Sequence, residues 1–153
     1  MTENKKQYLD LLLLADEEEA MIDKYLSRGD LFALYDGDLK SVCVVTDETD
    51  GIFELQNIAV RERYQRQGYA STLIKYLFEY YRDRCLTMLV GTGDSTVMIP
   101  FYEQFGFVFY YRIKNYMTEN YSRPMFEDGK QLFDKVYFKK DFRPIIDGST
   151  ERG

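Results

Sequence analysis

Residues 54–70, ELQNIAVRERYQRQGYA, decide the fold, because they read as a strand, an anion-binding turn and the start of a helix. The turn offers successive backbone N–H groups and ends in Gly68, where a side chain would obstruct a ligand. Small residues follow at the positive end of the helix dipole. Three arginines (Arg61, Arg63, Arg66) against one glutamate add positive charge. The stretch therefore predicts a phosphate-binding turn.

The elements on either side of the turn follow from hydrophobic spacing. Apolar residues recur on one helical face over residues 70–81. Residues 52–60 alternate as a strand, and neither of its faces is uniformly apolar, as expected for a strand that serves a site. Strict alternation predicts one face with Ile52, Glu54, Gln56, Ile58 and Val60, and another with Phe53, Leu55, Asn57 and Ala59.

Two short segments resemble motifs of the GNAT family of N-acetyltransferases. Residues 65–70, QRQGYA, are similar to the family's Q/R-x-x-G-x-G/A motif, with Ala70 in place of the commoner second glycine. Residues 99–107, IPFYEQFGF, resemble its P-F-Y-E-x-x-G-F signature. The motifs occur in the right order, separated by a helix and a strand, and the resemblance covers about residues 16–113.

The remaining elements agree with this resemblance. Asp16 and Glu19 form a capping-box-like start to a helix, with a buried stripe that includes Met21 and Tyr25. We expect strands at 31–35, 39–46, 86–90, 107–113 and 134–140, a hairpin turn at 36–38, and a short helix capped by Ser95 or Thr96. This order predicts a mixed α/β sheet flanked by helices, in a single domain over residues 1–153. The resemblance implies the GNAT fold, a mostly antiparallel sheet with a splayed cofactor cleft.

The resemblance also implies acetyl-CoA as cosubstrate, held between strand 52–60 and strand 86–90. The Val60 N–H is then expected to donate to the thioester carbonyl, where negative charge develops. Asp94 and Ser95 fall where the family often has an asparagine that contacts the CoA arm. The implied cofactor-binding residues are Ile58, Ala59, Val60, Gln65, Arg66, Gln67, Gly68, Tyr69, Ala70, Ser71, Asp94 and Ser95.

The chain contains no histidine, so acid–base chemistry falls to carboxylates, tyrosine, lysine or cysteine. Tyr102 matches the family tyrosine that protonates the departing CoA thiolate, and the alternative is a core aromatic residue. Glu54 is the candidate base, because a carboxylate partway along the central strand can relay the proton of the substrate ammonium through water. Its neighbours Ile52 and Phe53 are expected to raise its pKa. The alternatives for Glu54 are a surface strand residue and a substrate-binding anion.

Composition excludes several classes of protein. The net charge is -6, which disfavours nucleic-acid binding. No stretch reaches the roughly 18 to 20 apolar residues that span a bilayer, so we expect a cytoplasmic protein that does not bind membranes. Cys43 and Cys85 lack the spacing of a metal site and are expected to be buried thiols, so no metal is predicted.

The predicted function is an acetyl-CoA-dependent N-acetyltransferase that acts on a small-molecule or peptide amine. Residues 9–15 are expected to supply an apolar wall for the acceptor. Tyr110, Tyr111, Tyr116 and Tyr121 either line the acceptor pocket or pack on the sheet, and packing is preferred. The alternative function is a noncatalytic acyl-CoA-binding sensor. Whether the protein transfers an acyl chain longer than acetyl depends on the room around Ala59 and Met88. The sequence does not decide between a monomer and a homodimer.

Overall fold

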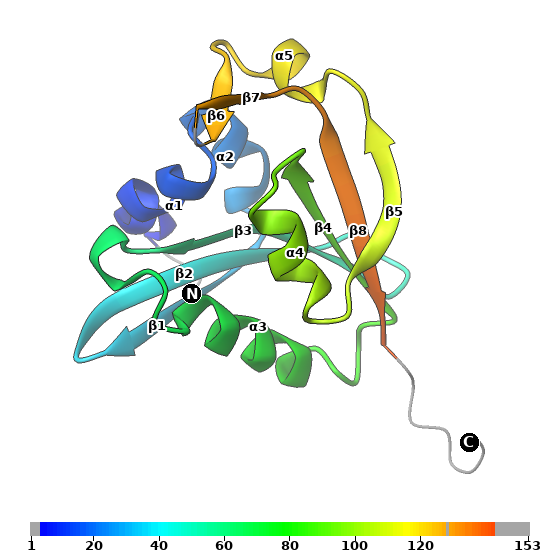
Figure 1. The fold of residues 1–153 in the computed structure, drawn as a ribbon. Coiled ribbons are helices and arrows are strands. Elements are labelled where there is room, and N and C mark those ends of the chain that lie inside the picture. Colours follow the sequence, from blue (N-terminus) through cyan, green and yellow to red (C-terminus); the bar gives the residue numbers. More distant parts are fainter. Residues whose placement is uncertain (1–3, 128, 143–153) are drawn as a thin grey trace.

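The computed structural model describes residues 4–127 and 129–142 (Figure 1). Its helices are η1 (Lys5–Tyr8), α1 (Leu9–Ala15), α2 (Glu19–Leu26), η2 (Glu62–Tyr64), α3 (Tyr69–Tyr80), α4 (Met98–Glu103) and α5 (Tyr116–Asn120). Its strands are β1 (Asp30–Asp36), β2 (Asp38–Asp47), β3 (Ile52–Val60), β4 (Thr87–Gly93), β5 (Val108–Ile113), β6 (Met125–Glu127), β7 (Lys130–Leu132) and β8 (Lys135–Asp141). No helix in these two ranges is long and apolar enough to cross a membrane.

A six-stranded sheet in the order β1-β2-β3-β4-β8-β5 forms the centre of the fold. β3 and β4 are parallel, and the other neighbours in the sheet are antiparallel. Helices α3 and α4 pack on one face, around Leu73, Ile74 and Tyr102, whereas α1 and α2 pack on the other, around Leu12 and Ile22 (Figure 1). The predicted mixed α/β sheet with flanking helices is therefore confirmed.

A β-bulge at Gln56 changes which residues of β3 face each helix layer. Val44 pairs with Asn57 and Val45 pairs with Leu55, which leaves Gln56 as the extra residue. Ile58 consequently packs in the α3 layer with Phe53 and Leu55, whereas Ala59 packs in the α1–α2 layer. Asn57 also faces that second layer, because its side chain bonds to Leu12 and Tyr25. The strict alternation predicted for this strand is wrong beyond Gln56, and the bulge places Glu54, Gln56 and Asn57 on one side of the sheet.

The capping box predicted at Asp16 is also wrong. Helix α2 begins at Glu19 with Glu18 as its N-cap, and residues 9–15 form a helix of their own. The Asp16 carboxylate instead accepts hydrogen bonds from the hydroxyls of Tyr25 at 3.2 Å and Tyr121 at 2.7 Å. The Asp16 side chain therefore links α2 to the segment after α5, and it does not cap the start of α2.

The segment between β5 and β8, for which the sequence predicted no helix or strand, contains α5 and the β6–β7 hairpin. β8 inserts between β4 and β5, which leaves β5 at the edge of the sheet (Figure 1). The side chains of β5 are exposed, with 60% of Phe109 and 50% of Tyr110 accessible to solvent. Tyr110 and Tyr111 therefore lie outside the core and do not line the cavity that lies where β3 and β4 separate, and Tyr111 packs on the sheet by stacking on Tyr137, with 4.7 Å between the ring centroids.

Candidate active site

The sheet opens between β3 and β4. Their parallel pairing runs from Ile52 and Thr87 to Leu55 and Val90, and β3 then continues to Val60 while β4 continues to Gly93 against β8. A cavity of about 880 Å³ lies at this opening, within the size range of small-molecule sites. The predicted splay of the two central strands is present.

The peptide groups at the end of β3 face this opening. The Arg61 N–H donates to the Lys40 carbonyl at 2.9 Å, so the backbone polar groups of Arg61 point toward β2. Because these groups alternate in direction along a strand, those of Ala59 also point toward β2. The N–H and C=O groups of Ile58 and Val60 therefore point toward the side from which β4 has separated. Gln65 Nε2 donates to the Val60 carbonyl at 3.1 Å, so the turn closes back onto the strand end.

The turn between β3 and α3 has the conformation that its sequence predicts. Gly68 is the N-cap of α3 with φ 89°, and a Cβ atom at this position would meet nothing within 4 Å. Arg66 also has a positive φ of 67° and lines the cavity. Arg61 differs from the expectation of charge at the turn, because its Nε donates to the Leu39 carbonyl at 3.0 Å. The open side of Gly68 leaves access to the backbone for an anion.

Most of the predicted cofactor residues line the cavity. Gln67 lies in the turn but does not line the cavity. Asp94 does not line the cavity either, and its carboxylate accepts a hydrogen bond from the Phe133 N–H at 3.0 Å. Ser95 Oγ lies just before α4, whose N-cap is Val97, and it accepts from the N–H of Met98 at 2.8 Å and donates to Glu127 at 2.6 Å. The cavity is lined by Ile58, Ala59, Val60, Gln65, Arg66, Gly68, Tyr69, Ala70, Ser71 and Ser95.

The β1–β2 hairpin holds the turn from both sides. The Tyr64 hydroxyl donates to Asp38 at 2.7 Å, and the Tyr69 hydroxyl donates to Asp36 at 3.0 Å. Lys40 Nζ pairs with Asp38 at 2.6 Å and lies 3.4 Å from the centroid of the Tyr64 ring. The hydrogen bonds from Lys40 and Tyr64 lower the pKa of Asp38 to about 2. Sequence reasoning missed this support, because Asp36 and Asp38 read only as residues of a hairpin turn.

Tyr102 lies where the core meets the cavity. Only 4% of the residue is exposed, yet it lines the cavity, and burial raises the pKa of its hydroxyl. Its ring packs edge-on against Phe101 and Phe107. Both readings of Tyr102, as a core aromatic residue and as a contact in the site, are compatible with this position.

Glu54 lines the same cavity from β3. Burial is the main cause that raises the pKa of its carboxyl group, and the negative charge of Glu48 adds to it. The cations Lys135 and Arg28 and a hydrogen bond from Tyr137 lower the pKa, but less than burial raises it. Phe53, expected to be responsible, packs on the opposite face of the sheet. A carboxyl group with a raised pKa is suited to accept a proton near neutral pH.

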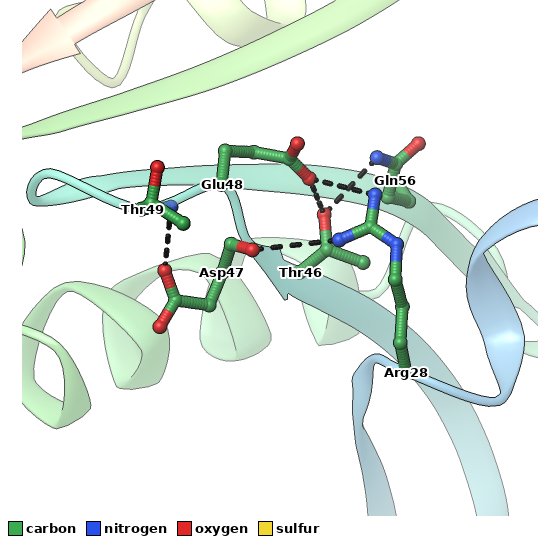
Figure 2. Close-up of polar contacts among 6 residues, drawn as sticks. All are labelled: Arg28, Thr46, Asp47, Glu48, Thr49 and Gln56. Atoms are coloured by element: carbon green, nitrogen blue, oxygen red, sulfur yellow. Dashed lines mark hydrogen bonds and ion pairs between the residues drawn. The ribbon is translucent and has the colours of Figure 1, made fainter.

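A polar network joins Gln56, the extra residue of the β3 bulge, to the end of β2 (Figure 2). Gln56 Nε2 donates to Thr46 Oγ1 at 3.1 Å, and Thr46 Oγ1 donates to Glu48 at 2.5 Å. Arg28 Nη2 donates to the same Glu48 oxygen at 2.9 Å. Sequence reasoning missed this network, because its members come from β2, β3 and the segments that follow α2 and β2.

The other wall of the cavity comes from α1, α2, α5 and β8. Leu14 and Ala15 line it, in agreement with the expected apolar wall, whereas Leu11 and Leu12 are buried in the core. Of the two residues expected to set the room for a longer acyl chain, Ala59 lines the cavity, whereas Met88 is buried in the core and does not line it. The wall also contains Asp16, Met21, Tyr25, Tyr116, Met117, Tyr121, Lys135 and Tyr137.

Comparison with known proteins agrees with this geometry. The family model described as "Acetyltransferase (GNAT) family" matches residues 3–107. The "Uncharacterized N-acetyltransferase YvbK" of Bacillus subtilis is 31% identical over 88% of each chain.

Two solved structures have a similar fold and carry a CoA ligand. A Bacillus subtilis acetyltransferase in complex with CoA is 31% identical over 91% of this chain and 93% of that chain, with a TM-score of 0.83. A GNAT family acetyltransferase from Elizabethkingia anophelis with acetyl-CoA bound is 30% identical over 87% and 89%, with a TM-score of 0.82. The chain therefore belongs to the acetyltransferase (GNAT) family and is an acyltransferase.

Proposed function

We propose that this protein transfers an acetyl group from acetyl-CoA directly to the amine of a small molecule or peptide. The observation that carries the proposal is the opening between β3 and β4, with the turn at Gly68 on the same cavity as Glu54 and Tyr102. Relatives with the same fold and about 30% identity bind CoA or acetyl-CoA.

The residues at the opening fit acetyl-CoA. The N–H groups from Arg66 to Ser71 lie at the N-terminus of the 12-residue helix α3, where a diphosphate is favoured. Arg66 adds a positive charge to the wall of the cavity. The outward-facing peptide groups of Ile58 and Val60 can pair with an extended amide-containing chain.

Acetyl-CoA supplies the acetyl group as a thioester, and the side chains of this protein manage the protons. The Glu54 carboxylate takes a proton from the acceptor ammonium through water, which frees the nitrogen lone pair for attack on the carbonyl carbon. The Ile58 N–H, which faces the opening nearer to Glu54 than the predicted Val60 N–H, donates to the carbonyl oxygen as its charge grows, a contribution of about 3 kcal/mol. As the new C–N bond forms and the C–S bond breaks, the Tyr102 hydroxyl donates a proton to the departing thiolate, and the second proton that the nitrogen loses on becoming an amide restores the Tyr102 hydroxyl through solvent.

The experiment that tests the proposal follows release of the CoA thiol with acetyl-CoA and a panel of small amines, amino acids and peptides. We expect saturable release with at least one amine and a product heavier by one acetyl group in the mass spectrum. Saturable binding of acetyl-CoA without release by any amine would instead indicate the sensor function. Mass spectrometry of copurified acyl-CoA tests whether the acyl group is acetyl or longer.

A further inference from the structure

Hydrogen bonds join two distant segments that both line the acceptor side of the cavity. The Ser122 N–H and the Ser122 hydroxyl both donate to Glu18 Oε2 at 2.7 Å. The Tyr121 hydroxyl donates to Asp16 Oδ1, also at 2.7 Å. These bonds fasten the connection between α1 and α2 to the connection between α5 and β6. The end of α1 and the strand β6 are therefore held at the same cavity.

Two large apolar side chains from these elements are exposed at the cavity. Leu14 near the end of α1 is 52% exposed, and Phe126 on β6 is 56% exposed, yet both line the cavity. A ligand in the cavity can therefore reach both side chains. Leaving a large apolar side chain exposed forgoes the free energy of its burial, and apolar surface at a binding cavity marks a place where a ligand buries it.

Three methionines extend this apolar surface into the cavity. Met21 on α2, Met117 on α5 and Met125 on β6 line the cavity, and each is more deeply buried than Leu14 or Phe126. Methionine is unbranched and polarizable, so it adapts to apolar groups of different shape. The apolar side chains come from both of the segments that the hydrogen bonds join, and a chain that enters between them meets apolar surface on two sides.

Most charged side chains on this side of the cavity already interact with groups of the protein. Arg28 pairs with Glu48 at 2.9 Å. The Asp16 carboxylate accepts hydrogen bonds from two tyrosine hydroxyls, and Glu127 accepts one from a serine. Lys135 Nζ lies 4.7 Å and 4.9 Å from the centroids of two tyrosine rings. Because cations and carboxylates occur together here, they do not select one sign of charge in the body of a ligand.

We propose that the acceptor amine carries an apolar body that packs between Leu14 and Phe126 while its amino group reaches Glu54. The inference rests on the proposed acetyl transfer and deepens it, because it names the class of amine. Leu14 and Phe126 determine specificity and do not contact the reacting atoms. A contact that is equal in the ground state and the transition state changes KM and leaves kcat unchanged.

The test compares two primary amines whose chains contain the same number of non-hydrogen atoms. Hexylamine has an apolar chain, whereas 2-(2-aminoethoxy)ethanol carries an ether and a hydroxyl oxygen. Release of the CoA thiol gives kcat/KM for each amine. We expect the wild type to favour hexylamine about tenfold or more. The ether oxygen makes the second amine less basic, so basicity acts against this preference, and comparison of variants on the same two amines cancels it.

Leu14→Ser and Phe126→Ser should each reduce the preference for hexylamine severalfold by raising its KM. Because both side chains are exposed, we expect both variants to fold, and kcat/KM for 2-(2-aminoethoxy)ethanol and the Kd of acetyl-CoA should change little. Phe109→Ser is the matched control, since Phe109 is 60% exposed on β5 and does not line the cavity. It should leave the preference in place.

Three results would overturn the inference while thiol release with some amine leaves the proposed function standing. The first is a wild type that acetylates 2-(2-aminoethoxy)ethanol as efficiently as hexylamine, or other amines but not hexylamine. The second is an unchanged preference in both Leu14→Ser and Phe126→Ser, and the third is an equal loss of preference in Phe109→Ser. Binding of acetyl-CoA without thiol release by any amine would instead contradict the proposed function, and with it the inference.

Discussion

Leu55 on β3 and Val90 on β4 form the last pair of the parallel ladder before the two strands separate. Glu54 precedes this pair, opposite Leu89, and is therefore fixed within the closed part of the sheet. Val60 lies five residues beyond Leu55 along β3, about 16 Å at the usual rise of a strand. The proposed base is thus held rigidly at the inner end of an opening whose outer end carries the turn at Gly68.

Replacing Glu54 tests the proposed base. In Glu54→Gln we expect kcat to fall by about 10²-fold to 10⁴-fold, because the ammonium loses its proton acceptor. The Kd of acetyl-CoA should not change, since Glu54 does not contact the proposed diphosphate site. Steady-state kinetics and calorimetry measure the two quantities. A kcat close to that of wild type would assign Glu54 to the alternative role of a substrate-binding anion.

The pH dependence of kcat/KM tests the electrostatics around Glu54. Activity should rise with pH as Glu54 loses its proton, and burial places this rise above the pH expected for an ordinary glutamate. Arg28 lowers the pKa of Glu54, so Arg28→Met should move the rise to higher pH. Arg82→Met, at an exposed arginine that pairs with Glu79, is the control and should leave the profile in place. A profile that does not move in Arg28→Met would argue against Glu54 as the titrating group.

Tyr102 and Tyr81 offer a matched pair for testing the proposed acid. Tyr102→Phe should lower kcat about 10²-fold while the fold and the KM of acetyl-CoA are retained. Tyr81 is buried in the same core cluster but does not line the cavity, and its hydroxyl donates to Asp30 at 2.7 Å. Tyr81→Phe should therefore cost about 1 kcal/mol of unfolding free energy, with kcat retained. Equal kcat values for the two variants would refute the assignment of Tyr102.

Lys40 connects the β1–β2 hairpin to the turn, and its removal should weaken cofactor binding. In Lys40→Met the ion pair with Asp38 and the contact with the Tyr64 ring are lost. We expect acetyl-CoA to bind several-fold more weakly with little change in kcat at saturation. In an NMR titration the pKa of Asp38 should rise from about 2 toward its ordinary value of 3.8. An Asp38 pKa that stays near 2 in Lys40→Met would show that Lys40 is not the group that lowers the pKa of Asp38.

Strongly periodic and turn-forming segments could be predicted from the sequence. The bounds predicted for β3 are those observed, α3 begins and ends within one residue of its predicted range, and the hairpin at Gly37 is present. The bulge at Gln56 could not be predicted, because it depends on pairing with Val44 and Val45 and leaves no mark in the period of two. Helix α5 and the β6–β7 hairpin were missed because they are only five and three residues long.

The cofactor turn and the acceptor wall of the candidate site also differ in how far they could be predicted from the sequence. The cofactor turn is continuous in sequence, so its glycine and the residues beside it could be recognised together. The acceptor wall comes from four separate elements, and Asp16 meets Tyr121 across 105 positions of the chain. Local patterns assign such residues to local roles, which is why Asp16 was expected to cap a helix.

The binding of acetyl-CoA to glycine variants tests the central claim most directly. Gly68 and Gly129 both have positive φ, 89° and 77°, and a Cβ atom at either position would meet nothing within 4 Å. Glutamate therefore brings the same charge and similar backbone strain at both sites, but only Gly68 lies at the proposed diphosphate site. We predict saturable binding by calorimetry for wild type and Gly129→Glu, and at least a hundredfold loss of affinity in Gly68→Glu. Equal affinity in the two variants, or no saturable binding by the wild type, would contradict the account.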